Sequence, residues 1–62
     1  MREIKEVEQL IQSYFTDLFI SDKECTDVEA MLDASRLEAY DNGDYDKYVA
    51  ISMNLLETIE SH

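Results

Sequence analysis

The sequence predicts an all-α protein: a small up-and-down bundle of three helices, a helical hairpin plus a third helix, in one acidic domain spanning residues 1–62. Three observations predict this fold. Apolar residues recur at helical spacing in three segments. Residues that favour helix ends stand between these segments. The chain has one glycine and no proline, so few positions force a break. The expected helices span about residues 3–19, 27–41 and 45–59.

The first expected helix carries a regular apolar seam. Its members alternate at spacings of three and four residues, which is the pattern of a buried helix face: Ile4, Val7, Ile11, Tyr14 and Leu18. Glu3 and Glu6 lie in the first turns, where the partial positive charge of a helix N-terminus favours anions. Residues 3–19 are therefore expected to form an amphipathic helix.

A capping box opens the second expected helix. The Thr26 side chain can accept the backbone N–H of Glu29, and the Glu29 carboxylate can accept the backbone N–H of Thr26. Cys25 then stands just outside the cap, placed to contact Ala30 as a hydrophobic staple. The apolar residues of this helix cover a wide arc, which favours a middle helix with two neighbours.

The third expected helix follows a stop and restart at residues 41–44. Gly43 takes the left-handed conformation that ends a helix, and Asp44 can cap the next one. Residues 48–56 contain no charge, so this helix is expected to be central or covered by a partner. A short chain gains little from a monomeric core. We therefore predict a homodimer through three residues of this stretch: Tyr48, Ile51 and Leu55.

The composition limits the classes of function. Five basic residues oppose 15 acidic ones, giving a net charge of −10. Such a surface repels nucleic-acid phosphates and anionic membranes, so we expect neither as a direct ligand and expect a partner protein with a basic surface patch. One cysteine excludes a disulfide framework and a zinc finger. No run approaches the ~20 apolar residues of a membrane span, and no signal-peptide pattern is present, so a cytoplasmic protein is expected.

No catalytic or metal-binding pattern is found in the sequence. Cys25 has acidic neighbours, which lower the reactivity of a thiol; a redox role is the alternative to packing. His62 is terminal, where a fixed catalytic geometry is hard to hold. The acids around Gly43 fail the calcium-loop register, because Tyr40 and Val49 then fall at ligand positions. We expect no enzyme activity, cofactor or metal.

The expected partner-binding surface combines acids and tyrosines. Residues 17–46 hold ten acids and two bases, a net −8, and tyrosine is enriched at interface hot spots. The candidate contacts are Glu24, Asp27, Asp33, Tyr40, Asp41, Asp44, Tyr45 and Asp46. They favour a protein–protein interaction module, an inhibitor or regulator that occupies the surface of its partner. Two alternatives remain: a DNA mimic that blocks a nucleic-acid-binding protein, and a structural homo-oligomer with no foreign partner.

The stretch Leu-Ile-Gln-Ser-Tyr-Phe at residues 10–15 resembles a Leu-Ile-x-Ser-Tyr-Phe stretch of the Sda-type sporulation inhibitors. Those small helical hairpins bind a sensor histidine kinase and block it. The match covers six residues; the connection is longer here and the third helix has no counterpart. Residues 37–56 also resemble the short helical IDEAL-type segments of similar bacteria. The resemblances imply a small bacterial or phage regulatory protein, and no binding residue is carried over from either.

Overall fold

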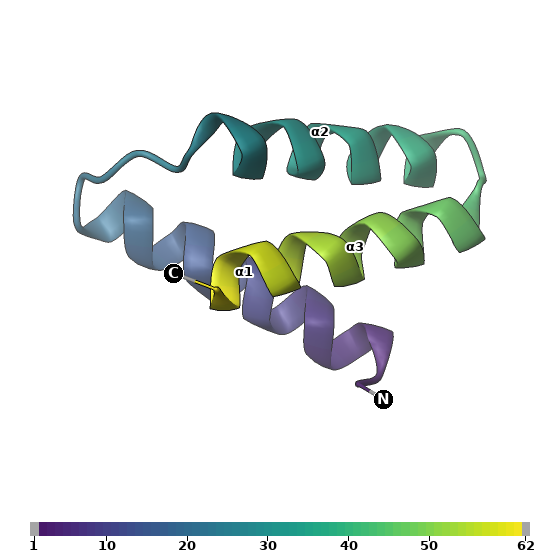
Figure 1. Ribbon diagram of the computed structural model, residues 1–62, viewed down its shortest axis with the longest axis horizontal. Coiled ribbons are helices and arrows are strands. Elements are labelled where there is room, and N and C mark those ends of the chain that lie inside the picture. Colours follow the sequence, from purple (N-terminus) through teal and green to yellow (C-terminus); the bar gives the residue numbers. More distant parts are fainter. Residues whose placement is uncertain (1, 62) are drawn as a thin grey trace.

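The computed structural model describes residues 2–61 and confirms the all-α fold. α1 spans Ile4–Ile20, α2 spans Asp27–Asp41 and α3 spans Tyr45–Glu60, each bound within one residue of the expectation. Residues 2–61 contain no strand. α2 and α3 form an antiparallel hairpin, and α1 crosses α3 at an angle (Figure 1). The arrangement is a small three-helix bundle.

The apolar core forms where α1 meets α3. Val7 and Ile11 of α1 pack with Leu55 and Leu56 of α3, and all four are buried. Half-buried apolar side chains surround this cluster: Ile4, Phe15, Leu32, Met53 and Ile59. Full burial of one such aliphatic side chain is worth about 1.5–3 kcal/mol, so these four side chains are the main apolar contribution of the α1–α3 contact to stability.

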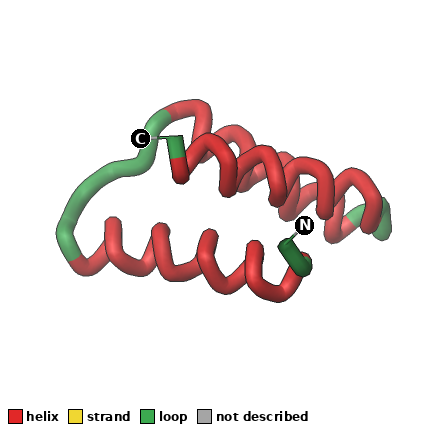
Figure 2. Tube along the Cα trace, turned by 60° about the horizontal axis from the view of Figure 1, so that its bottom comes forward, coloured by secondary structure: helices red, strands yellow, loops and turns green. Residues whose placement is uncertain are grey.

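α3 is the central helix of the bundle. Its backbone lies against both α1 and α2, whereas α2 reaches α1 through long side chains. The tube in Figure 2 shows α2 and α3 side by side as one layer and α1 as a second layer. The expectation that residues 27–41 form the middle helix is therefore wrong. Tyr48 and Ser52 are buried along with the α3 core residues, which explains why residues 48–56 carry no charge.

The α1–α2 connection begins with a C-cap of α1 and ends with an N-cap of α2. Asp22 adopts a positive φ of 54° and its N–H bonds to Phe19 O at 3.2 Å, while Lys23 N–H bonds to Leu18 O at 2.9 Å. These two bonds make a Schellman C-cap without glycine. The predicted capping box is confirmed at the start of α2, where both reciprocal hydrogen bonds are present.

The α2–α3 connection is a second Schellman C-cap, and here the sequence prediction is confirmed. Gly43 has φ 76°, its N–H bonds to Tyr40 O at 3.1 Å, and Asp44 N–H bonds to Ala39 O at 2.9 Å. The Asp44 carboxylate accepts the Lys47 N–H at 3.3 Å and so caps α3. A side chain at Gly43 would meet no other atom within 4 Å, so it is the backbone conformation that favours glycine there.

Two side-chain contacts fasten the N-terminal part of the chain to the hairpin. The Tyr14 hydroxyl of α1 donates to the fully buried Glu29 carboxylate of α2, 2.9 Å from Oε1 and 2.8 Å from Oε2. Glu29 Oε1 also accepts the Thr26 N–H at 2.9 Å. Burial and the Glu29 carboxylate raise the pKa of Tyr14. Arg2 pairs with Glu60 at 2.7 Å on the surface, where an ion pair contributes little.

Candidate functional site

The structure separates the predicted partner-binding residues into three places. Glu24 lies in the α1–α2 connection and Asp27 begins α2, whereas Asp33 lies in the middle of that helix. The other five gather at the α2–α3 turn: Tyr40, Asp41, Asp44, Tyr45 and Asp46. The two ends of α2 are about 21 Å apart at 1.5 Å per residue. The acids therefore do not form one continuous band.

The five residues at the α2–α3 turn, here named the turn cluster, combine exposed aromatic rings with exposed carboxylates. Tyr40 is 60% exposed and Tyr45 is 55% exposed. Both rings pack on Tyr48, with centroid distances of 5.2 Å and 6.1 Å. Asp41 and Asp46 are exposed beside them, while Asp44 is engaged as the α3 cap. The contacts with Tyr48 therefore fix two exposed tyrosine rings next to exposed carboxylates.

Tyr48 links the turn cluster to a polar network between all three helices. Its hydroxyl donates to the Glu8 carboxylate of α1 and accepts from Arg36 Nη1 of α2 at 3.4 Å. The Arg36 guanidinium also lies 5.9 Å from the centre of the Tyr48 ring, and its Nε donates to Asp33 Oδ1 at 2.8 Å. Burial and the Glu8 carboxylate raise the pKa of Tyr48. Asp33, a predicted partner contact, is thus already paired within the chain.

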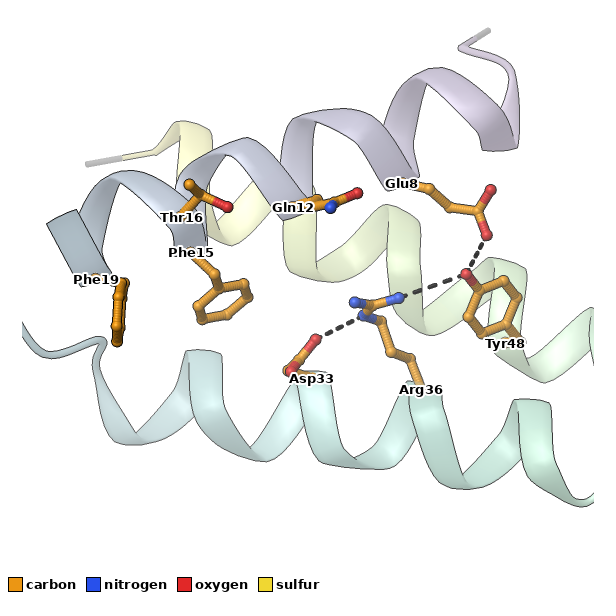
Figure 3. Close-up of a pocket in the computed structure, with 8 residues that line it drawn as sticks. All are labelled: Glu8, Gln12, Phe15, Thr16, Phe19, Asp33, Arg36 and Tyr48. Carbon is orange, nitrogen blue, oxygen red and sulfur yellow. Dashed lines mark hydrogen bonds and ion pairs between the residues drawn. The ribbon is translucent and has the colours of Figure 1, made fainter.

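An open groove of about 510 Å³ lies between α1 and α2 above this network. α1 lines one wall with Glu8, Gln12, Phe15, Thr16 and Phe19, α2 supplies Asp33 and Arg36, and Tyr48 of α3 closes one end (Figure 3). Sequence reasoning did not identify this groove. A signal was present, because residues 8, 12, 15 and 19 repeat at helical spacing beside the core seam of α1.

The predicted self-association residues lie largely inside one chain. Tyr48 is 4% exposed, Leu55 is fully buried and Ile51 is half-buried. The prediction assumed that Ile51 and Leu55 would be left in water, and for Leu55 this assumption is wrong. α1 and α2 together cover most of the uncharged part of α3, and Ala50 and Asn54 of this part are exposed. The homodimer stays a prediction, and burial within one chain already explains the pattern that suggested it.

The residues considered for catalysis or metal binding form no such site within residues 2–61. Cys25 is a half-buried free thiol, and its expected staple partner Ala30 is exposed. His62 lies outside the described residues. Within residues 2–61, no group of three or more His, Cys, Asp or Glu side chains is arranged to hold a metal ion. In the same range, every helix is too short or too polar to cross a membrane.

Fold and surface together define the class of protein: a small, strongly acidic three-helix bundle with exposed aromatic rings at one turn and an open groove between α1 and α2. Comparisons with protein-family models, with curated proteins and with solved structures found no match.

Proposed function

We propose that this protein is a protein–protein interaction module that binds a basic surface of a partner protein and regulates or inhibits that partner. The turn cluster is the observation that carries the proposal. Exposed tyrosines beside exposed carboxylates offer both parts of a typical contact: apolar rings that lose water on binding and charges that select a basic partner.

The distribution of charge supports this proposal. Twelve of the 15 acidic side chains are exposed, and the two ion pairs between residues 2 and 61 involve only Glu60 and Asp33. Most of the net charge of −10 therefore faces water. Such a surface steers a basic protein toward it and speeds association at low salt. The proposed compartment is the cytoplasm, where the Cys25 thiol stays reduced.

A photoreactive amino acid at position 45 tests the proposal directly. The variant is expressed in the native host, irradiated, and the cross-linked products are identified by mass spectrometry. We expect one dominant basic protein. The matched control carries the same group at Asn54, which is exposed on α3 in an uncharged stretch away from the turn cluster. A product obtained equally from both positions contradicts a site at the turn cluster.

Competition with DNA separates the proposed function from its nearest alternative. The captured protein is bound to the purified chain and then challenged with duplex DNA. If binding to a regulatory surface is correct, DNA does not displace the chain. Displacement by DNA with a steep loss of affinity in salt assigns the acidic surface to DNA mimicry instead. A cross-linked product consisting of this chain alone assigns it to a homo-oligomer.

A further inference from the structure

α1 has an apolar core face and, beside it, a mixed face that combines the polar side chains Glu8 and Gln12 with Phe15 and Phe19. The first face is the core seam with Val7 and Ile11. The second follows residues 8, 12, 15 and 19 and lines the groove toward α2. Phe15 on this face is half-buried, but Phe19 is 86% exposed. Phe15 and Phe19 together give one end of the groove a continuous apolar lining, and such apolar patches are typical of contact surfaces.

The groove has the length and shape for a helix. From residue 8 to residue 19 the wall of α1 extends about 17 Å, or three helical turns. Phe15 and Phe19 form one end, and Tyr48 forms the other, with Arg36 between them (Figure 3). When a helix binds in a groove, its apolar side chains at helical spacing make the main contacts.

Charge complementarity selects the occupant. The groove contains Glu8 and Asp33 against Arg36, and Arg36 is already bound to Asp33 and to the Tyr48 hydroxyl. Asp17 lies exposed on the adjoining surface. The whole chain carries −10, so a second copy would bring −20 together, whereas a basic helix is attracted from every direction.

We propose that the groove between α1 and α2 binds a basic amphipathic helix of the partner protein. Apolar residues of that helix cover Phe15 and Phe19, and its lysines or arginines face Glu8 and Asp17. Tyr48 lines one end of the groove and packs against Tyr40 of the turn cluster, so the groove lies next to the turn cluster. The inference rests on the proposed function, because it names the part of the partner that this surface binds.

The test uses a fluorescent peptide of about 15 residues, roughly the length of the groove plus a turn, with leucines at one helical face and lysines elsewhere. Its binding to the full chain is measured by fluorescence anisotropy. The peptide is compared with a scrambled peptide of the same composition, in which the leucines do not share a helical face. A third peptide keeps the leucine positions and replaces every lysine by glutamate, so it tests whether binding requires a basic peptide.

Phe19→Ser and Ile20→Ser form a matched pair. Both side chains are strongly exposed on α1, at 86% and 74%, but only Phe19 lines the groove. We expect the leucine–lysine peptide to bind at least about tenfold more weakly to F19S and almost unchanged to I20S. The scrambled and leucine–glutamate peptides should bind more weakly to the unaltered chain. A circular dichroism spectrum confirms that both variants stay folded.

Three outcomes overturn the inference: no binding of the leucine–lysine peptide, equal binding of the scrambled peptide, or the same loss in F19S and I20S. None of these affects the cross-linking result at position 45. If a partner is cross-linked at position 45 but the leucine–lysine peptide does not bind, the turn cluster stays the proposed binding site and the groove is excluded as one. Failure of both experiments removes the proposed function itself.

Discussion

Tyr14→Phe removes a single oxygen atom from the contact that joins α1 to α2. The Tyr14 hydroxyl lies 2.9 Å and 2.8 Å from the two carboxylate oxygens of Glu29, which is fully buried. The ring stays in place in the variant, so its packing on Phe15 is kept. The change therefore isolates the hydrogen bond, and the structure predicts a large loss of stability.

The expected loss is about 2 kcal/mol. A hydrogen bond to a charged group contributes about 1.5–3 kcal/mol, and the buried Glu29 carboxylate loses a donor that water cannot easily replace. A chain of this size has a total stability of only about 3–9 kcal/mol. The midpoint of thermal unfolding should therefore fall by about 8–16 °C, at 4–8 °C per kcal/mol for a small domain. Urea unfolding followed by circular dichroism measures the free energy.

Tyr45→Phe is the matched control for this experiment. The Tyr45 side chain is 55% exposed, so removal of its hydroxyl should change stability by less than about 0.5 kcal/mol. The reasoning is refuted if Tyr14→Phe is as stable as the unaltered chain. Tyr14→Phe and Glu29→Gln can also be combined in a double-mutant cycle. Because the two residues are in contact, their losses of unfolding free energy should not be additive, and additive losses would also refute the reasoning.

Three further predictions concern the helix ends and the tyrosines. Gly43→Val should destabilise the fold by roughly 1 kcal/mol or more in urea unfolding, because φ is 76° there and a β-branched residue is strained at positive φ. Asp22→Gly should stabilise by about 0.5–1 kcal/mol, because it removes strain at φ 54° and a negative charge from the C-terminus of α1; unchanged stability contradicts the strain. Burial together with a neighbouring carboxylate raises the pKa of Tyr14 and of Tyr48, so the folded state holds these protons more tightly than the unfolded state. Their contribution is complete below the ordinary tyrosine pKa of about 10 and is lost as pH rises through the raised pKa values. The free energy of unfolding should therefore fall above about pH 10, more steeply than in Tyr48→Phe.

Local signals in the sequence predicted the helices and most of their ends. Thr26 and Glu29 are three residues apart, and Gly43 is the one residue free to take positive φ, so both features follow from neighbouring positions. The positive φ of Asp22 could not be predicted from neighbouring positions, because several polar residues between positions 21 and 25 can adopt a positive φ. The burial of Glu29 depends on Tyr14, which is 15 positions away, and no local pattern encodes that contact.

The candidate site was predicted only in part. The tyrosines and acids at the turn were identified from composition, and the turn cluster does bring them together. Asp33 was counted as a partner contact although it stands three residues before Arg36 in the same helix, a spacing that allows the ion pair they form. Only the position of Arg36 over Tyr48 depends on packing of α2 on α3. The groove was missed because it depends on the angle at which α1 crosses α3, which helical periodicity does not determine.

The measurement that tests the central claim most directly is the affinity of the captured partner for two charge variants, followed against salt. Asp41→Asn with Asp46→Asn removes two charges from the turn cluster, and Glu3→Gln with Glu57→Gln removes two exposed charges elsewhere. A basic partner at the turn cluster predicts a clear loss of affinity for the first variant only, with a weaker dependence on salt. Equal affinity for both variants, or an affinity that ignores salt, contradicts recognition of a basic partner by this acidic surface.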